Sequence, residues 1–92
     1  MEIKREAMAG TLESSDAMVT VCPDSEELTI LLQSNVEDYY GDSIRASIMA
    51  VLTEMGVKTG RIEVADRGAL DCTIRARVTT ALRRSGVEEA AL

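Results

Sequence analysis

The most constraining feature of this sequence is an apolar stripe between residues 42 and 56, because its spacing suits one kind of regular structure. Asp42 is the predicted N-cap, and Gly56 stands where a left-handed residue would end a helix. The polar remainder of the segment predicts one buried face, so the rest of the chain must supply one covering surface. The apolar residues recur at i, i+4, i+7, i+8 and i+11, the period of an α-helix: Ile44, Ile48, Val51, Leu52 and Met55.

Two short runs before this helix are predicted to be β-strands. AMVTVC (17–22) is rich in β-branched residues, and ELTILLQSN (27–35) places Leu28, Ile30 and Leu32 on one face. The segment between the runs contains the only proline of the chain, which favours a turn. Because the runs are close in sequence, we predict that they pair as an antiparallel hairpin.

The second half of the chain predicts one more strand and one more helix. Ile62 and Val64 alternate as in a strand over residues 61–65, and Asp66-Arg67-Gly68 turns the chain. ALDCTIRARVTTALRR (69–84) fits both a strand alternation and a helical stripe. Since its length exceeds a typical strand, we predict a helix.

These elements predict an α+β fold. Their order is ββαβα, with a further short strand over residues 7–12. Together the elements are expected to form a two-layer sandwich. A small mixed β-sheet of three or four strands is packed by two helices. The passage from residue 28 to 65 predicts parallel strands joined by a right-handed crossover. The length fits one domain over residues 1–92, and residues 1–6 are expected to fray.

Composition argues against several classes of function. The net charge of −6 at pH 7 disfavours nucleic-acid and anionic membrane partners. The chain has no histidine, the commonest general base and metal ligand, so we predict no metal site. No apolar run is long enough to span a bilayer. Cys22 and Cys72 match no ligand spacing, and we expect buried, reduced thiols in a cytoplasmic protein.

The stretch GTLESSD (10–16) places two adjacent hydroxyls between carboxylates. Neither Ser14 nor Ser15 has a nearby base or oxyanion site, so neither is predicted to be a catalytic nucleophile. The pair either shapes a turn or includes a serine that another protein modifies. Because Glu13 and Asp16 would repel a tightly held phosphate, a phosphate-bearing group attached here should project outward.

Two further groups are weaker candidates for contacts with a partner. Tyr39 and Tyr40 are the only aromatic residues, and tyrosine is enriched at interfaces. Arg67, Arg75 and Arg77 are predicted to pair with carboxylates on a solvated face or, alternatively, to dock a partner.

Three motifs, taken together, closely resemble the acyl carrier protein (gamma) subunit family of citrate lyase. That family shows a GTLES-G-D stretch, a FGD-x-IR helix start and a D-x-GALDC-x-xRAR segment. This chain has GTLESSD, YYGDSIRASI and DRGALDCTIRARV in the same order. It departs at Ser15, where glycine is usual, and at Tyr40, where phenylalanine is usual. The sister carrier of malonate decarboxylase shares the layout more loosely.

The resemblance implies a covalently modified carrier and not an enzyme. In the family, the GTLES serine is joined by a phosphodiester to a 2'-(5''-phosphoribosyl)-3'-dephospho-CoA arm. That position is Ser14 here, with Ser15 as the less favoured alternative. The thiol of the arm, not Cys22 or Cys72, would carry acetyl and citryl thioesters during citrate cleavage to acetate and oxaloacetate.

The resemblance also implies partners, namely the alpha (transferase) and beta (lyase) subunits of citrate lyase and the prosthetic-group transferase. The predicted strands do not fit the four-helix bundle of ordinary acyl carriers. Two alternatives remain open at this point. One is an unmodified regulatory or structural interaction module, and the other is the carrier of a malonate decarboxylase complex.

Overall fold

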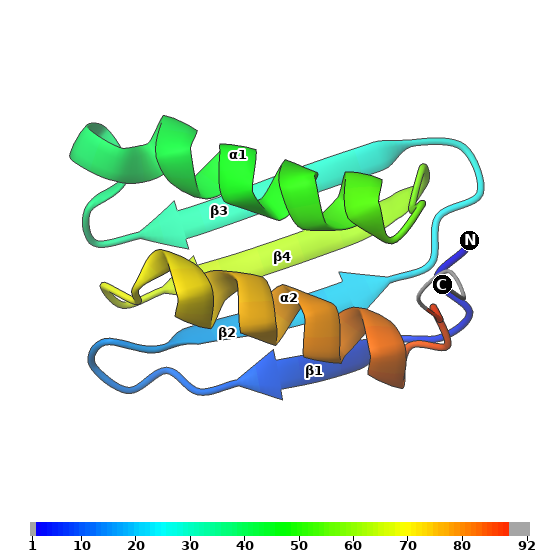
Figure 1. The fold of residues 1–92 in the computed structure, drawn as a ribbon, viewed down its shortest axis with the longest axis horizontal. Coiled ribbons are helices and arrows are strands. Elements are labelled where there is room, and N and C mark those ends of the chain that lie inside the picture. Colours follow the sequence, from blue (N-terminus) through cyan, green and yellow to red (C-terminus); the bar gives the residue numbers. More distant parts are fainter. Residues whose placement is uncertain (1, 89–92) are drawn as a thin grey trace.

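The computed structural model describes residues 2–88 and has two layers, a four-stranded sheet and two helices that cover one of its faces (Figure 1). This arrangement confirms the predicted α+β sandwich and its ββαβα order, with the additional first strand. The elements are β1 (Ala7–Gly10), β2 (Ala17–Cys22), β3 (Leu28–Ser34), α1 (Glu37–Glu54), β4 (Gly60–Asp66) and α2 (Asp71–Arg84).

The strand order of the sheet is β1-β2-β4-β3, so β4 lies between β2 and β3. β2 is antiparallel to both β1 and β4, and the predicted hairpin between β2 and β3 is therefore wrong. β3 and β4, which precede and follow α1 in the sequence, are parallel neighbours in the sheet, as predicted. The physical reason lies in burial: Ile62 and Val64 of β4 are almost fully buried, whereas the residues of β3 are half-buried or exposed. The more buried strand takes the central position.

The hydrophobic core lies between the sheet and the two helices. Every residue of the apolar stripe predicted for α1 is buried, from Ile44 to Met55. Residues 69–84, whose pattern fitted both a strand and a helix, contain the helix α2, as their length indicated. α2 buries its own stripe against the sheet, with the residues Ile74, Val78, Ala81 and Leu82.

α1 begins earlier than the sequence suggested. Its N-cap is Val36 and not Asp42, because the N–H groups of Tyr39 and Tyr40 already donate to the Val36 carbonyl, at 3.1 and 2.9 Å. The N–H of Val36 in turn donates to Ser34 Oγ at 3.1 Å, which fixes the chain at the end of β3. The other end is as predicted, since Gly56 has a φ of 70° just after the helix.

The start of the chain and the two cysteines also differ from expectation. Ile3 is buried, and the N–H groups of Lys4 and Arg5 donate to the Ser85 carbonyl at 2.9 and 3.2 Å, so the backbone at residues 3–5 is held and not frayed; Met1 lies outside the described residues. Cys22 is half-buried and Cys72 is exposed. Cys22 ends β2, and Cys72 lies in the first turn of α2, outside its apolar stripe.

Candidate functional site

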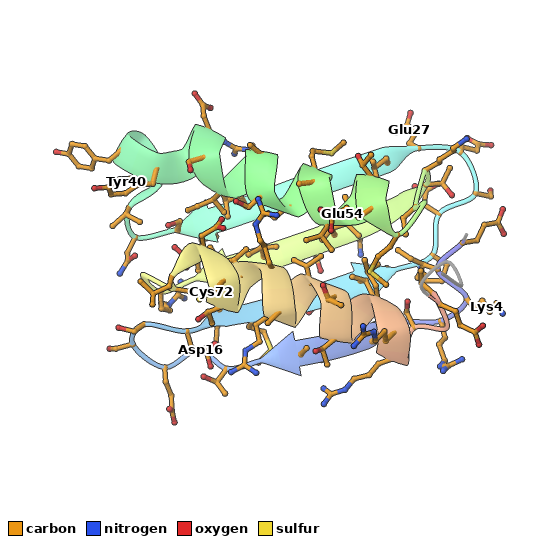
Figure 2. The ribbon with its side chains drawn as sticks, viewed as in Figure 1. Lys4, Asp16, Glu27, Tyr40, Glu54 and Cys72 are labelled. Atoms are coloured by element: carbon orange, nitrogen blue, oxygen red, sulfur yellow. The ribbon has the colours of Figure 1, made fainter. Side chains whose placement is uncertain are left out.

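Ser14 lies in the connection between β1 and β2, residues 11–16, which we call the Ser14 loop. The side chain is exposed, and its hydroxyl has no hydrogen-bond partner within residues 2–88. The loop lies at the end of the molecule where both helices begin (Figure 1). Asp16, Cys72 and Tyr40 mark this end, opposite Lys4 (Figure 2).

Asp16 holds the base of the Ser14 loop. Arg77 of α2 donates to both of its carboxylate oxygens, from Nε to Oδ1 and from Nη2 to Oδ2, each at 3.0 Å. Thr11 Oγ1 and the N–H of Ala17 each donate at 2.7 Å. These donors, and the Arg77 guanidinium most of all, hold the pKa of Asp16 well below its usual range. A carboxylate so engaged structures the loop and does not serve as a base for Ser14.

Backbone hydrogen bonds attach the same loop to the segment that follows β4. The N–H of Ser15 donates to the Arg67 carbonyl at 2.8 Å, and the N–H of Arg67 donates to the Asp16 carbonyl at 2.9 Å. The N–H of Asp16 also donates to the Glu13 carbonyl at 3.2 Å, which closes a turn around Ser14. Ser14 therefore extends from backbone that is held on both sides.

Two positions of GTLESSD have conformations that favour glycine. Gly10 has a φ of 98°, and a Cβ there would lie 1.8 Å from the Ala17 carbonyl oxygen, so only glycine fits. Ser15 has a φ of 65°, unlike every other non-glycine residue that the structure describes. That conformation explains why glycine suits this position in the resembled pattern. Since both serines are exposed, exposure alone does not choose between Ser14 and Ser15.

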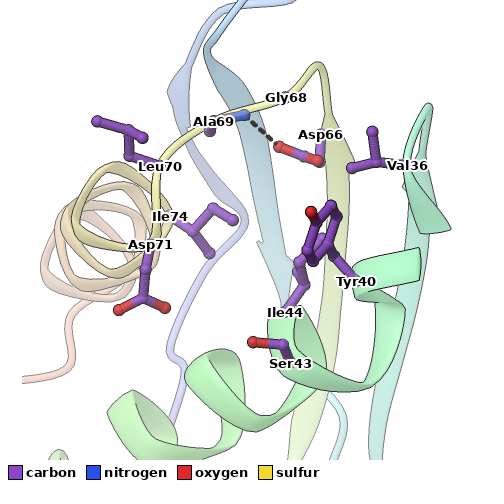
Figure 3. Close-up of a pocket in the computed structure, with 10 residues that line it drawn as sticks. All are labelled: Val36, Tyr40, Ser43, Ile44, Asp66, Gly68, Ala69, Leu70, Asp71 and Ile74. Carbon is purple, nitrogen blue, oxygen red and sulfur yellow. Dashed lines mark hydrogen bonds between the residues drawn. The ribbon is translucent and has the colours of Figure 1, made fainter.

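A pocket of about 330 Å³ lies between the starts of α1 and α2, on the helix side of the sheet (Figure 3). Two carboxylates reach it, and both already accept hydrogen bonds. Asp66 accepts from Ser34 Oγ at 2.8 Å and from the N–H of Ala69 at 2.9 Å. Asp71 accepts from Ser47 and, at 2.9 Å, from Arg75 Nε, and the Ser47 bond is the main cause of its lowered pKa. The remaining lining is largely apolar: Val36, Tyr40, Ile44, Ala69, Leu70 and Ile74.

Metal-ligand clusters and membrane-spanning helices were both sought among the described residues. Within residues 2–88, no group of three or more His, Cys, Asp or Glu could hold a metal ion. No helix in the same range has the length and apolar content needed to cross a membrane. Tyr39 is 86% exposed and Tyr40 is 59% exposed, so both aromatic side chains are on the surface.

Two of the three predicted arginine pairs are present. Arg75 pairs with Asp71 and Arg77 pairs with Asp16, whereas Arg67 Nη1 donates to the Asp66 carbonyl at 3.2 Å and has no carboxylate partner in the part of the chain that the structure describes. The sequence reading treated Asp16 as a free charge that repels phosphate. It missed the pairing with Arg77, for which no local sequence signal exists.

Known proteins share both the sequence and the fold. Residues 4–85 match the acyl carrier family described as malonate decarboxylase delta subunit (MdcD). A chain in the crystal structure of a Pseudomonas malonate decarboxylase hetero-tetramer in complex with malonate superposes with a TM-score of 0.78. The match covers 94% of this chain and 89% of that chain at 18% sequence identity, so this similarity concerns the fold alone.

Curated relatives are much closer in sequence. The citrate lyase acyl carrier protein of Streptococcus equi subsp. zooepidemicus is 51% identical over 90 residues, covering 96% of this chain and 88% of the relative. That of Streptococcus mutans serotype c is 50% identical over 90 residues, covering 97% and 88%. That of Treponema denticola is 49% identical over 85 residues, covering 92% and 97%. With such identity over nearly its whole length, this chain belongs to the citrate lyase acyl carrier protein family.

Proposed function

We propose that this chain is the acyl carrier subunit of a cytoplasmic citrate lyase, with a phosphoribosyl-dephospho-CoA arm attached to Ser14 through a phosphodiester. Family membership supports the carrier role, in which the chain itself is not an enzyme. The observation that carries the choice of Ser14 is its position as the serine of GTLES, and its exposed hydroxyl, unbonded within residues 2–88, is open to modification. The arm, when attached, supplies the thiol that carries acyl groups as thioesters.

The residues of the Ser14 loop fit a large covalent group. An acceptor hydroxyl must be open to a modifying enzyme and must not be engaged by its own fold, and Ser14 meets both conditions. Asp16 is paired with Arg77, so less negative charge opposes a phosphodiester than the sequence alone suggested. Ser14 needs no base of its own, because the modifying enzyme activates it.

The ordered loop gives the carrier a defined point of attachment. Arg67 and Arg77 hold Ser15 and Asp16 after Ser14, and the N–H of Asp16 donates to the carbonyl of Glu13 before it, so the arm starts from one place on the surface. A tethered acyl group is held at an effective concentration of about a millimolar at sites within its reach. The proposed partners are the alpha and beta subunits of citrate lyase and the prosthetic-group transferase.

Intact-mass measurement of the chain purified from its native host tests this proposal. We expect the added mass of the arm in the parent chain and in Ser15→Ala, and its loss in Ser14→Ala. Ser15→Ala is the matched control, because it removes the neighbouring hydroxyl from the same loop. Loading that is lost in Ser15→Ala and kept in Ser14→Ala would show that the site is Ser15. A parent chain without added mass would refute the modified carrier.

A further inference from the structure

The face of the sheet that points away from the helices carries a groove that begins at the Ser14 loop. Both helices pack on the other face, and no helix within residues 2–88 covers this one (Figure 1). The groove has a volume of about 440 Å³, and Leu12 of the Ser14 loop and Arg67 line it at one end. Its floor comes from alternate residues of the three neighbouring strands: Met18, Thr20, Glu63, Ala65, Leu31 and Gln33.

Much of this floor is apolar and open to solvent. Leu12 is 56% exposed and Leu31 is 48% exposed, and Met18, which also lines the groove, is half-buried. Met8 of β1, 49% exposed, continues the same face beyond the groove, since it pairs with Thr20. Exposed apolar side chains that gather on one face indicate a contact surface.

Arg67 supplies positive charge at the end of the groove nearest Ser14. Its backbone is bonded to Ser15 and Asp16, which places residue 67 directly beside the loop. Its guanidinium uses one donor on the Asp66 carbonyl and has no carboxylate partner among residues 2–88, so further donors remain for an anion. The carboxylate of Glu63 lies further along β4, 3.8 Å from Arg61 Nε.

We infer that this groove is the resting site of the half of the arm nearest Ser14, with a phosphate on Arg67 and the adenosine on the apolar floor. The inference rests on the proposed function, in which Ser14 carries the arm. A planar, uncharged base suits a flat apolar surface, and the Met18 thioether makes favourable contacts with aromatic rings. The polar side chains of Thr20 and Gln33 offer hydrogen-bond partners at the edges of the base.

The pocket between the helix starts suits this half of the arm less well. Asp66 and Asp71 line it, and no lysine or arginine stands among its described lining residues. A phosphate there would meet two carboxylates and no lining cation, whereas the groove offers Arg67 and one carboxylate, Glu63, which is 3.8 Å from Arg61 Nε. With its first half on the sheet, the arm leaves its thiol-bearing half free to reach the sites of its partners.

The test compares backbone amide chemical shifts of the loaded and unloaded full-length chains, each verified by intact mass. We expect the differences to gather on the groove, at Met18, Leu31, Ala65 and Arg67, and to be small along α1 and α2. Titration of the unloaded chain with free 2'-(5''-phosphoribosyl)-3'-dephospho-CoA, which carries the phosphate of that half of the arm, should move the same amides. Arg67→Gln should weaken binding of this probe roughly two- to fivefold, as for one exposed charge pair.

Lys4→Gln is the matched control, because it removes the same charge at an exposed position at the end of the molecule opposite the Ser14 loop (Figure 2) and should not affect probe binding. Absence of the arm from native material would refute the proposed function and not merely this inference. An arm that is present but leaves the groove amides unchanged, or shifts those of the helix-side pocket, would overturn the inference. It would also be overturned if the groove amides change only when a partner subunit is added, because the face would then be a protein interface.

Discussion

Replacing Ser15 with glycine should stabilise this chain, although glycine substitutions usually destabilise. Ser15 has a φ of 65°, and a left-handed conformation costs an L-residue about 1–2 kcal/mol. Glycine avoids this cost, but it also lowers the free energy of unfolding by about 0.5–1 kcal/mol, because the unfolded chain gains conformational freedom. The hydroxyl of Ser15 is exposed, so its loss changes little. The difference predicts that Ser15→Gly raises the free energy of unfolding by about 0.5 kcal/mol.

Urea unfolding followed by far-UV circular dichroism suits this measurement, because the chain has no tryptophan. With a slope of about 1 kcal/mol per molar urea, the midpoint should rise by about 0.5 M. Ser14→Gly is the control, since residue 14 does not have a positive φ and the same substitution should lower the midpoint. If both variants lower the midpoint equally, the left-handed conformation of Ser15 carries no cost and the reasoning is refuted.

Three other outcomes are expected. Leu82 is fully buried, so Leu82→Ala should lower the free energy of unfolding by about 3 kcal/mol in urea unfolding, while Leu70→Ala, at a 71% exposed site, should change it little. Because folding lowers the pKa of Asp16, its contribution to stability is complete above about pH 5 and is lost as the pH falls below about 4. Melting temperatures across this range should therefore fall less steeply in Asp16→Asn than in the parent, and parallel profiles would contradict the assignment. In single-cysteine variants, exposed Cys72 should react with a maleimide faster than half-buried Cys22, as measured by mass spectrometry.

The sequence predicted the helices well because their evidence is local. The stripe from Ile44 to Met55 and the stripe of α2 each lie within one element, and each needs only one covering face. The parallel pairing of β3 and β4 also followed from a local pattern, a strand, a helix and a strand in succession.

The strand order could not be predicted in the same way. Both β3 and β4 have apolar residues that alternate, and the sequence does not state which of them lies beside β2. Proximity along the chain favoured β3, whereas the fuller burial of Ile62 and Val64 beneath the helices favours β4. Pairing between distant strands depends on the packing of the whole domain.

The candidate site was also predictable from the sequence only in part. The motif GTLESSD pointed to Ser14, but the bond between Asp16 and Arg77 joins residues 61 positions apart, and no periodicity reveals it. The exposure of Cys72 had a signal that was not used, since the helical stripe through Ile74 places residue 72 on another face.

The residues that hold the Ser14 loop in place are synthesised long after Ser14 itself. The loop leaves the ribosome early, but β4, which pairs with β2, and Arg77, which binds Asp16, come from the second half of the chain. A nascent chain that stops before residue 77 lacks the two hydrogen bonds from Arg77 that hold Asp16 at the base of the loop. An enzyme that recognises this loop would therefore modify finished molecules, so attachment would also act as a check that translation and folding have been completed.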